Sequence, residues 1–162
     1  MYMKNIVVTG GAGFLGRHIC KRLMQSADVH VYCIDNFVTG RKENISEFET
    51  DDRFTCIKRD IVENLAVLVD AGTLPSEIHE IYHLACIASP PTYKEFSIET
   101  LMTSFVGTKN VLDLAKMTGA KVLFSSTSEV YGDPQVHPQP EEYYGNVNTV
   151  GERSCYDEGK RV

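Results

Sequence analysis

Two stretches near the start of this 162-residue chain decide its fold: IVVTGGAGFLG at residues 6–16 and VHVYCID at residues 29–35. The apolar run of the first stretch ends in three glycines spaced three apart, Gly10, Gly13 and Gly16. The apolar run of the second ends in an acid, Asp35, nineteen positions after the last of these glycines. This spacing predicts a strand, a tight turn, a helix and a second strand, which together form a dinucleotide-binding βαβ unit.

The same unit predicts an NAD site. Gly10 allows the tight turn, Gly13 lets the backbone approach a pyrophosphate, and Gly16 lets the helix pack closely on the sheet. The amino end of the helix offers free N–H groups and a partial positive charge to the phosphates. Asp35 would accept hydrogen bonds from both ribose hydroxyls and repel a 2′-phosphate, so we expect NAD rather than NADP. The alternative is an ordinary βαβ crossover that binds no ligand.

The composition is typical of a soluble globular domain with one core. Apolar residues make up 43% of the chain, charged residues 23%, and the net charge is −6. We find no Lys/Arg cluster for nucleic acid, no apolar stretch near the ~20 residues of a membrane span, and no signal peptide before the first strand. Five cysteines without a C-x-x-C motif predict reduced thiols, a cytoplasmic location and no metal site.

Strand-like and helix-like segments alternate along the chain. We expect strands at residues 5–9, 29–34, 54–58, 80–84 and 121–125, and helices at residues 14–25, 41–48, 61–70, 92–118 and from 154 onward. This alternation predicts an α/β fold, namely a Rossmann-like, doubly wound parallel sheet with helices on both faces. We expect residues 1–162 to form one NAD-binding domain.

The fourth expected helix has two apolar faces. Residues at three-, four- and seven-residue steps form one apolar stripe, and three further apolar residues lie off it. The stripe consists of Ile98, Leu101, Phe105, Leu112 and Ala115, and the others are Met102, Val106 and Val111. The second face is available to another helix, such as one from a partner subunit.

Two further strand ends point to the cofactor, because ligands bind at the carboxyl ends of strands in doubly wound sheets. Asp60 and Ile61 follow the third strand, where the acid is expected to bind the adenine amino group. The alternative for Asp60 is a helix N-cap. The run Leu84, Ala85 and Cys86 follows the fourth strand and would line the central part of the cofactor, with ordinary core as the alternative.

The irregular stretch of residues 133–148 contains three prolines and is too long for a simple connection. A loop of this length in a compact domain is a lid, a binding loop or a disordered segment.

A phenol and an ammonium group are expected side by side near the end of the chain. Tyr156 and Lys160 are four residues apart, so on a helix they share one face. A nearby cation lowers the pKa of a tyrosine, which would make Tyr156 a base that removes a proton from an alcohol as hydride leaves its carbon. The Thr127 hydroxyl would hold the reacting oxygen. The alternatives are a surface helical pair and, for Thr127, Ser128 and Glu129, a polar end of a strand.

Taken in order, these motifs resemble the extended short-chain dehydrogenases, the family of nucleotide-sugar epimerases and dehydratases. The matching strings are TGGAGFLG at 9–16, DNFxTG at 35–40, HLA at 83–85, STSEVYG at 126–132 and YxxxK at 156–160. Longer strings are most similar to the UDP-glucuronate decarboxylase branch: DNFVTGRK at 35–42, ASPP at 88–91, STSEVYGDP at 126–134 and CYDEGKRV at 155–162.

The resemblance implies which residues act and which hold NAD. The implied catalytic residues are Thr127, Ser128, Glu129, Tyr156 and Lys160. The implied cofactor-binding residues are Gly10, Gly13, Phe14, Leu15, Gly16, Asp35, Asn36, Val38, Thr39, Gly40, Asp60, Ile61, Leu84, Ala85, Cys86, Thr103, Tyr156 and Lys160.

The implied reaction converts UDP-glucuronate into UDP-xylose. Hydride leaves C4 for NAD⁺ while Tyr156 accepts the hydroxyl proton, and the resulting 4-keto intermediate loses carbon dioxide. The enolate is protonated at C5, and hydride returns to C4, so NAD is regenerated. Thr127 would bind the C4 oxygen, while Ser128 and Glu129 would position the sugar and assist proton movements.

Members of this family are longer than 162 residues, so the resemblance implies an N-terminal half without most of the substrate-binding part. We expect this piece alone to be inactive, and the family implies a homodimer through a four-helix bundle. The sequence also departs from the family pattern: Ser104 replaces asparagine, Met102 replaces lysine and Ala66 replaces tyrosine. A nucleotide-sugar 4-epimerase, a 4,6-dehydratase and a non-catalytic NAD-binding module therefore stay open as alternatives.

Overall fold

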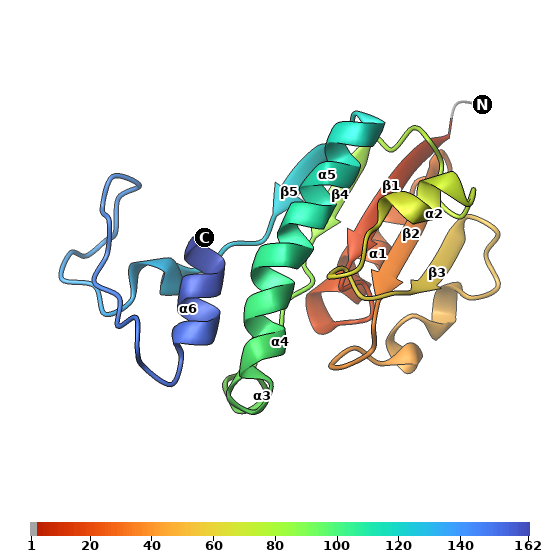
Figure 1. Ribbon diagram of the computed structural model, residues 1–162. Helices are drawn as coiled ribbons and strands as arrows, with labels where there is room; N and C mark the ends of the chain where they lie inside the picture. Colours follow the sequence, from red (N-terminus) through yellow and green to blue (C-terminus); the bar gives the residue numbers. More distant parts are fainter. Residues whose placement is uncertain (1–2) are drawn as a thin grey trace. The chain divides into compact units, whose positions relative to one another are not determined.

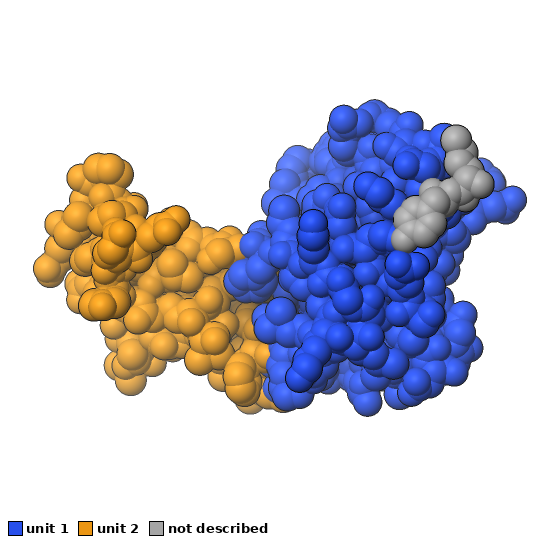
Figure 2. Space-filling model, turned by 90° about the horizontal axis from the view of Figure 1, so that it is seen from above, with its two compact units in different colours: residues 1–85, 106–125 blue, residues 86–105, 126–162 orange. Residues whose placement is uncertain are grey.

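The computed structural model describes residues 3–162, which fall into two compact units. Unit 1 consists of residues 1–85 and 106–125, and unit 2 consists of residues 86–105 and 126–162, as coloured in Figure 2. Our expectation of one NAD-binding domain stays a prediction. Within residues 3–162, no helix has the length and apolar character needed to cross a lipid bilayer.

Unit 1 is a five-stranded sheet in which all paired neighbours are parallel, in the order β3-β2-β1-β4-β5 (Figure 1). The strands are β1 Lys4–Thr9, β2 Val29–Asp35, β3 Phe54–Lys58, β4 Glu80–His83 and β5 Lys121–Phe124. The helices of this unit are α1 Phe14–Leu23, α2 Ala66–Asp70 and α5 Thr108–Thr118. The order reverses beside β1, as in Rossmann-like folds, so the predicted fold class is confirmed.

Alternating side chains of β1 separate the core of unit 1 into two layers. Ile6 and Val8 pack with Cys20 of α1, whereas Val7 packs with Leu68 of α2 and Leu114 of α5. Because successive strand side chains point to opposite faces, these two clusters lie on the two sides of the sheet. Helices therefore cover both faces, as the alternation of segments predicts.

Unit 2 contains short helices and a long loop. Its elements are α3 Pro90–Glu95, α4 Ser97–Met102, the 3₁₀ turn η4 Ser128–Tyr131 and α6 Ser154–Arg161. A π-helical turn, η3 Thr103–Gly107, follows α4. The small core of this unit consists of Ile87, Tyr93 and Tyr156, with Cys86, Phe96 and Cys155 packed against it.

Three expected helices are shorter or broken, and for two of them a contact with a distant residue gives the reason. Residues 41–48 form only two 3₁₀ turns, η1 Lys42–Asn44 and η2 Ser46–Phe48. The Asn44 side-chain amide and the Arg41 backbone amide both donate to the Ala12 carbonyl, at 2.7 and 3.2 Å, which ties this segment to the glycine loop.

The expected helix at 61–70 begins only at Ala66. The side-chain amide of Asn110, from α5, donates to the carbonyls of Ile61, Val62 and Glu63, at 2.9, 2.9 and 3.1 Å. These carbonyls therefore accept from a side chain rather than from the next helical turn. The proposal of Asp60 as a helix N-cap is wrong, since no helix begins there and its Oδ1 accepts from the Val62 amide at 2.9 Å in a local turn.

The expected helix at 92–118 is divided into α3, α4, η3 and α5. It is interrupted at Phe96, whose φ of −110° and ψ of 55° are not helical, and again by the π turn. The expected apolar stripe is mostly exposed, including Ile98, Leu101, Phe105 and Leu112. The buried face of α5 instead consists of Val111, Leu114, Ala115 and Thr118.

Candidate functional site

The glycine loop of unit 1 has the close backbone contacts that its spacing predicts. Gly10 has a φ of 72°, which a residue with a side chain rarely adopts. A Cβ on Gly16 would lie 2.1 Å from the Gly10 carbonyl oxygen, so only glycine allows α1 to approach the turn this closely. Gly13 is the residue immediately before α1, and the side chains of Phe14 and Leu15 on the first turn are exposed. The free amides of this helix end are thus available to an anion.

Asp35 ends β2 beside this loop and is buried. Its Oδ2 accepts from the Ala12 amide at 3.0 Å and its Oδ1 from the Phe37 amide at 2.8 Å. Burial raises the pKa of Asp35, and the two amide hydrogen bonds oppose that rise. Each carboxylate oxygen can accept a further hydrogen bond, which leaves capacity for ribose hydroxyls. A Cβ on Gly40 would lie 2.7 Å from Oδ1, so a glycine at 40 lets the chain pass directly over the acid.

The residues after β2 and β3 meet at the same edge of the sheet. The Asn36 side-chain amide donates to Asp60 Oδ2 at 2.8 Å, and Asn36 Oδ1 accepts from the Val38 amide at 3.1 Å. Val38 and Thr39 are exposed. The Ile61 side chain, in contrast, is 3% exposed and belongs to the core. Only its backbone is therefore left for a role in cofactor binding.

The end of β4 also lies against the glycine loop. A Cβ on Gly10 would lie 2.9 Å from Ala85 Cα, so Ala85 packs directly on the turn. Leu84 and Ala85 are partly exposed, as residues that line a ligand should be. Cys86, predicted with them, belongs to unit 2, where its Sγ lies 3.5 Å from Ser104 Oγ.

In unit 2 the structure brings together the two hydroxyls predicted to act on substrate. Tyr156, on α6, forms a side-chain hydrogen bond with Thr127. The Thr127 hydroxyl also accepts from the Glu129 amide at 3.2 Å and thereby caps η4, the turn that carries Ser128 and Glu129. Lys160 lies one turn after Tyr156 on α6, so both residues lie on one side of this helix.

The expectation of a lowered pKa for Tyr156 is wrong in this structure. The side chain is 8% exposed, and its ring stacks on Tyr93 with centroids 5.2 Å apart. Burial raises the pKa of Tyr156, while the hydrogen bond with Thr127 lowers it by a smaller amount. The sequence shows the spacing of Tyr156 and Lys160 but not the burial of the phenol.

The departures Ser104 and Met102 lie on the segment that contacts α6. A Cβ on Gly159 would lie 2.9 Å from Ser104 Cβ, so a small buried residue at 104 allows α6 to pack against the π turn. Thr103, predicted to contact the cofactor, is the first residue of this turn and is partly buried. Met102 is exposed, and nothing in the structure explains its replacement of lysine.

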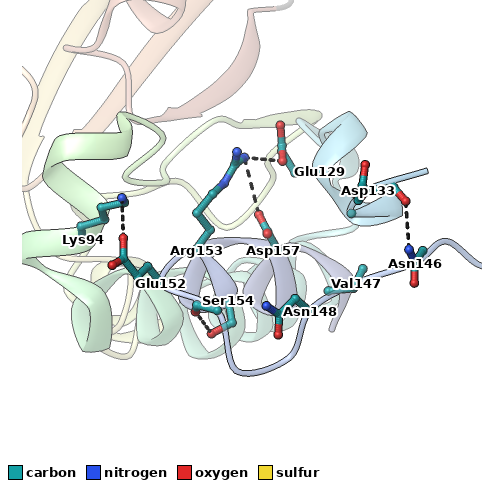
Figure 3. Close-up of a pocket in the computed structure, with 12 residues that line it drawn as sticks. Lys94, Glu129, Asp133, Asn146, Val147, Asn148, Glu152, Arg153, Ser154 and Asp157 are labelled. Atoms are coloured by element: carbon teal, nitrogen blue, oxygen red, sulfur yellow. Dashed lines mark hydrogen bonds and ion pairs between the residues drawn. The ribbon is translucent and has the colours of Figure 1, made fainter. Parts of the chain in front are cut away.

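A pocket of about 690 Å³ opens within unit 2 (Figure 3). Its lining residues come from α3, η4, the long loop, the segment before α6 and α6 itself, and include Glu129, Asn148, Arg153 and Asp157. The two ends of the loop are joined by a hydrogen bond, in which the Asp133 amide donates to the Asn146 carbonyl at 2.9 Å. The three alternatives for residues 133–148, a lid, a binding loop or a disordered segment, stay predictions.

Sequence reasoning missed the charged partners of Glu129. Arg153 forms an ion pair with Glu129 and lies 4.0 Å from Asp157, one turn further along α6 (Figure 3). The four-residue spacing of Arg153, Asp157 and Arg161 is the signal that would have placed them on one helix face. No three His, Cys, Asp or Glu side chains among residues 3–162 are grouped as metal ligands.

Comparisons with known proteins agree with this geometry. The profile of the NAD dependent epimerase/dehydratase family matches residues 6–162. The chain belongs to this family. Its cofactor is NAD, and the glycine loop and Asp35 of unit 1 fit that cofactor.

Similar curated proteins are decarboxylases. The chain is 52% identical over 157 residues to UDP-glucuronic acid decarboxylase 6 of Arabidopsis thaliana, covering 97% of this chain and 43% of that protein. It is also 52% identical over 159 residues to UDP-glucuronic acid decarboxylase 1 of Xenopus tropicalis, covering 98% and 35% respectively. The chain thus spans less than half the length of these relatives.

Solved structures of related enzymes have the same fold. UDP-N-acetylglucosamine 4-epimerase from Methanobrevibacter ruminantium M1, in complex with UDP-N-acetylmuramic acid, superposes with a TM-score of 0.79 at 29% identity. The match covers 99% of this chain and 48% of the epimerase.

Proposed function

We propose that the protein containing this chain is an NAD-dependent UDP-glucuronate decarboxylase that forms UDP-xylose. The observation that carries the proposal is the hydrogen-bonded pair of Tyr156 and Thr127, in a chain about half identical to decarboxylases of this substrate. Oxidation at C4 of the sugar requires a base that removes the proton of the C4 hydroxyl and a second hydroxyl group that hydrogen-bonds to the same oxygen.

The residues of unit 1 would hold the cofactor. The amino end of α1, after Gly13, would face the pyrophosphate, and Asp35 would accept from the adenosine ribose hydroxyls. The exposed Val38 and Thr39 and the Asn36–Asp60 pair would contact the adenosine portion. When bound, NAD supplies a reversible hydride acceptor.

The residues of unit 2 would handle the protons. Tyr156, as phenolate, accepts the proton of the C4 hydroxyl, and Thr127 donates a hydrogen bond to the same oxygen. Loss of carbon dioxide then leaves negative charge on that oxygen, which both hydroxyl groups stabilise by hydrogen bonds. Glu129 and Ser128, on η4, position the sugar and assist protonation at C5. Lys160 assists Tyr156 from the next turn of α6 and would contact the nicotinamide ribose when NAD is bound.

We further propose that the intact protein is a homodimer formed through a helical bundle. Leu101 and Phe105 in unit 2 are 42% and 54% exposed, and Leu112 on α5 is 52% exposed. Exposed apolar side chains of this size on helices are typical of protein interfaces. All five cysteines are free thiols, which supports a reducing, cytoplasmic location.

Turnover by the intact gene product tests the function. We expect UDP-glucuronate, supplied with NAD, to give UDP-xylose and carbon dioxide, followed by NMR of the sugar and by gas release. UDP-galactose from UDP-glucose would instead indicate a 4-epimerase, and a 4-keto-6-deoxy sugar a dehydratase. A folded, NAD-bound protein that converts none of these would overturn the proposal in favour of a non-catalytic module.

A further inference from the structure

Glu129 lies on an element that cannot fix its side chain alone. The 3₁₀ turn η4 has four residues, and a helix this short is marginal without tertiary support. The Thr127 cap fixes the Glu129 amide, at 3.2 Å, but not its carboxylate. A carboxylate that moves a proton needs a defined position, so it requires an outside partner.

Arg153 supplies that partner from the position immediately before α6. Its Nη2 pairs with Glu129 Oε2, and the same nitrogen lies 4.0 Å from Asp157 Oδ1 (Figure 3). Asp157 is buried, and its Oδ1 has no hydrogen-bond partner. A buried carboxylate in that condition is costly unless a cation lies beside it. The Asp157 carboxylate thus stabilises the Arg153 guanidinium in the position from which the guanidinium reaches Glu129.

A second arginine on the same face of α6 fixes the backbone of the turn. Arg161 Nη1 donates to the Val130 carbonyl at 2.5 Å and to the Tyr144 carbonyl at 3.1 Å. Arg153, Asp157 and Arg161 are four residues apart, so they lie on one face of the helix. This face therefore contacts η4 at both the Glu129 side chain and the adjoining backbone.

We propose that Arg153 is a positioning residue that holds the Glu129 carboxylate for proton transfer, and that Asp157 orients Arg153. The inference rests on the proposed decarboxylase function, because it assumes that Glu129 assists protonation at C5. An ordinary exposed ion pair contributes little to stability or activity. The Arg153 pair differs from such a pair because one guanidinium faces two carboxylates, one of them buried.

The test uses the intact gene product with the variants Arg153→Met, Arg153→Lys and Asp157→Asn. The control is Lys21→Met, which removes the cation of an exposed ion pair with Glu47 in unit 1. We expect Arg153→Met to lower kcat by roughly 10- to 100-fold, within the range for loss of a general acid–base contribution, with KM changed by less than about threefold. Arg153→Lys should lose less kcat than Arg153→Met, because the lysine ammonium can still pair with one carboxylate.

A rescue experiment separates positioning from folding. Added guanidinium ion should restore part of the kcat of Arg153→Met and have no effect on Lys21→Met. A kcat unchanged in Arg153→Met, or a change confined to KM, would overturn the proposal. If Arg153→Met fails to fold, Arg153→Lys and Asp157→Asn answer the same question, since each weakens the contact without removing the side chain.

A titration distinguishes this proposal from the function on which it rests. Burial raises the pKa of Asp157, and Arg153 opposes that rise, so Arg153→Met should raise it further and Lys21→Met should not. Carboxyl NMR of Asp157 measures this without any substrate. An unaltered Asp157 pKa in folded Arg153→Met would contradict the contact between Arg153 and Asp157. If the Asp157 pKa shifts as expected but the protein has no decarboxylase activity, only the proposed function is contradicted.

Discussion

Tyr156 illustrates how one residue's surroundings determine its chemistry. Its phenol is buried against Tyr93, hydrogen-bonded to Thr127 and one helical turn from Lys160. Burial destabilises the phenolate, and the Thr127 hydroxyl stabilises it. The single O–H of Thr127 therefore acts on the base in the free protein, and it would donate to the proposed substrate oxygen once substrate is bound.

Removing that hydroxyl should shift the pH dependence of the reaction. Because the base acts as phenolate, the rate should rise with pH up to the raised pKa of Tyr156. Thr127→Val removes the contact that lowers this pKa in the free protein, so the rising limb of kcat/KM should move to higher pH, and Tyr156→Phe should lose at least ~100-fold at all pH values. Steady-state kcat/KM values from pH 6 to 10 check this.

Thr127→Ser is the matched control, because it keeps the hydroxyl and should keep the wild-type profile. A Thr127→Val profile that coincides with wild type would contradict the role of the contact.

Asp35 should make the free energy of unfolding of the chain depend on pH. Burial raises its pKa in the folded state, so in the range above the unfolded value the folded chain holds more protons than the unfolded chain. Its contribution to the free energy of unfolding therefore falls as pH rises from about 4 through the raised pKa. Asp35→Asn should remove this part of the dependence.

Urea unfolding of the wild-type chain and of Asp35→Asn between pH 3.5 and 7, without cofactor, measures how the free energy of unfolding of each depends on pH. Asp28→Asn serves as a control, since it changes an aspartate at an exposed position. Equal slopes for wild type and Asp35→Asn would refute the assignment.

Among the elements, α6 depends on a close approach to the π turn. Replacing glycine by alanine inside a helix normally stabilises it by about 1 kcal/mol. At Gly159 the added Cβ would lie 2.9 Å from Ser104 Cβ, an overlap that typically costs about 1–3 kcal/mol. We therefore expect Gly159→Ala to destabilise unit 2 despite the better helix propensity.

The double variant Gly159→Ala with Ser104→Gly removes the clashing atom and should recover most of the loss. Chemical denaturation of the two single variants and the double variant gives the coupling energy. Strict additivity of the two changes would show that the contact does not limit the packing of α6.

The helical elements also show where local sequence rules stop. The helix at α1 and the five strands follow from periodicity and glycine positions and lie where expected. The late start of α2 depends on Asn110, which is more than forty residues away. No window of local sequence contains that interaction.

For the molecule as a whole, the exposed helical surface predicts the oligomeric state. Phe105→Glu and Leu101→Glu should convert the intact protein from dimer to monomer, because each places a charge in an apolar interface. The Val67 side chain on α2 is 40% exposed, and we expect Val67→Glu to leave the dimer intact. Light scattering after gel filtration measures the mass, and a monomeric wild-type protein would contradict the proposed dimer.

The sequence by itself determined the first βαβ unit, the glycine loop and the position of Asp35, because these follow from residues close together in the chain. It also placed Tyr156, Thr127 and Glu129 in one group through the order of motifs. The tertiary structure alone decided the division of the long helix, the direction of the Tyr156 pKa shift and the pairing of Arg153 with Glu129. Burial and pairing depend on segments that are distant in sequence, and local patterns do not encode those contacts.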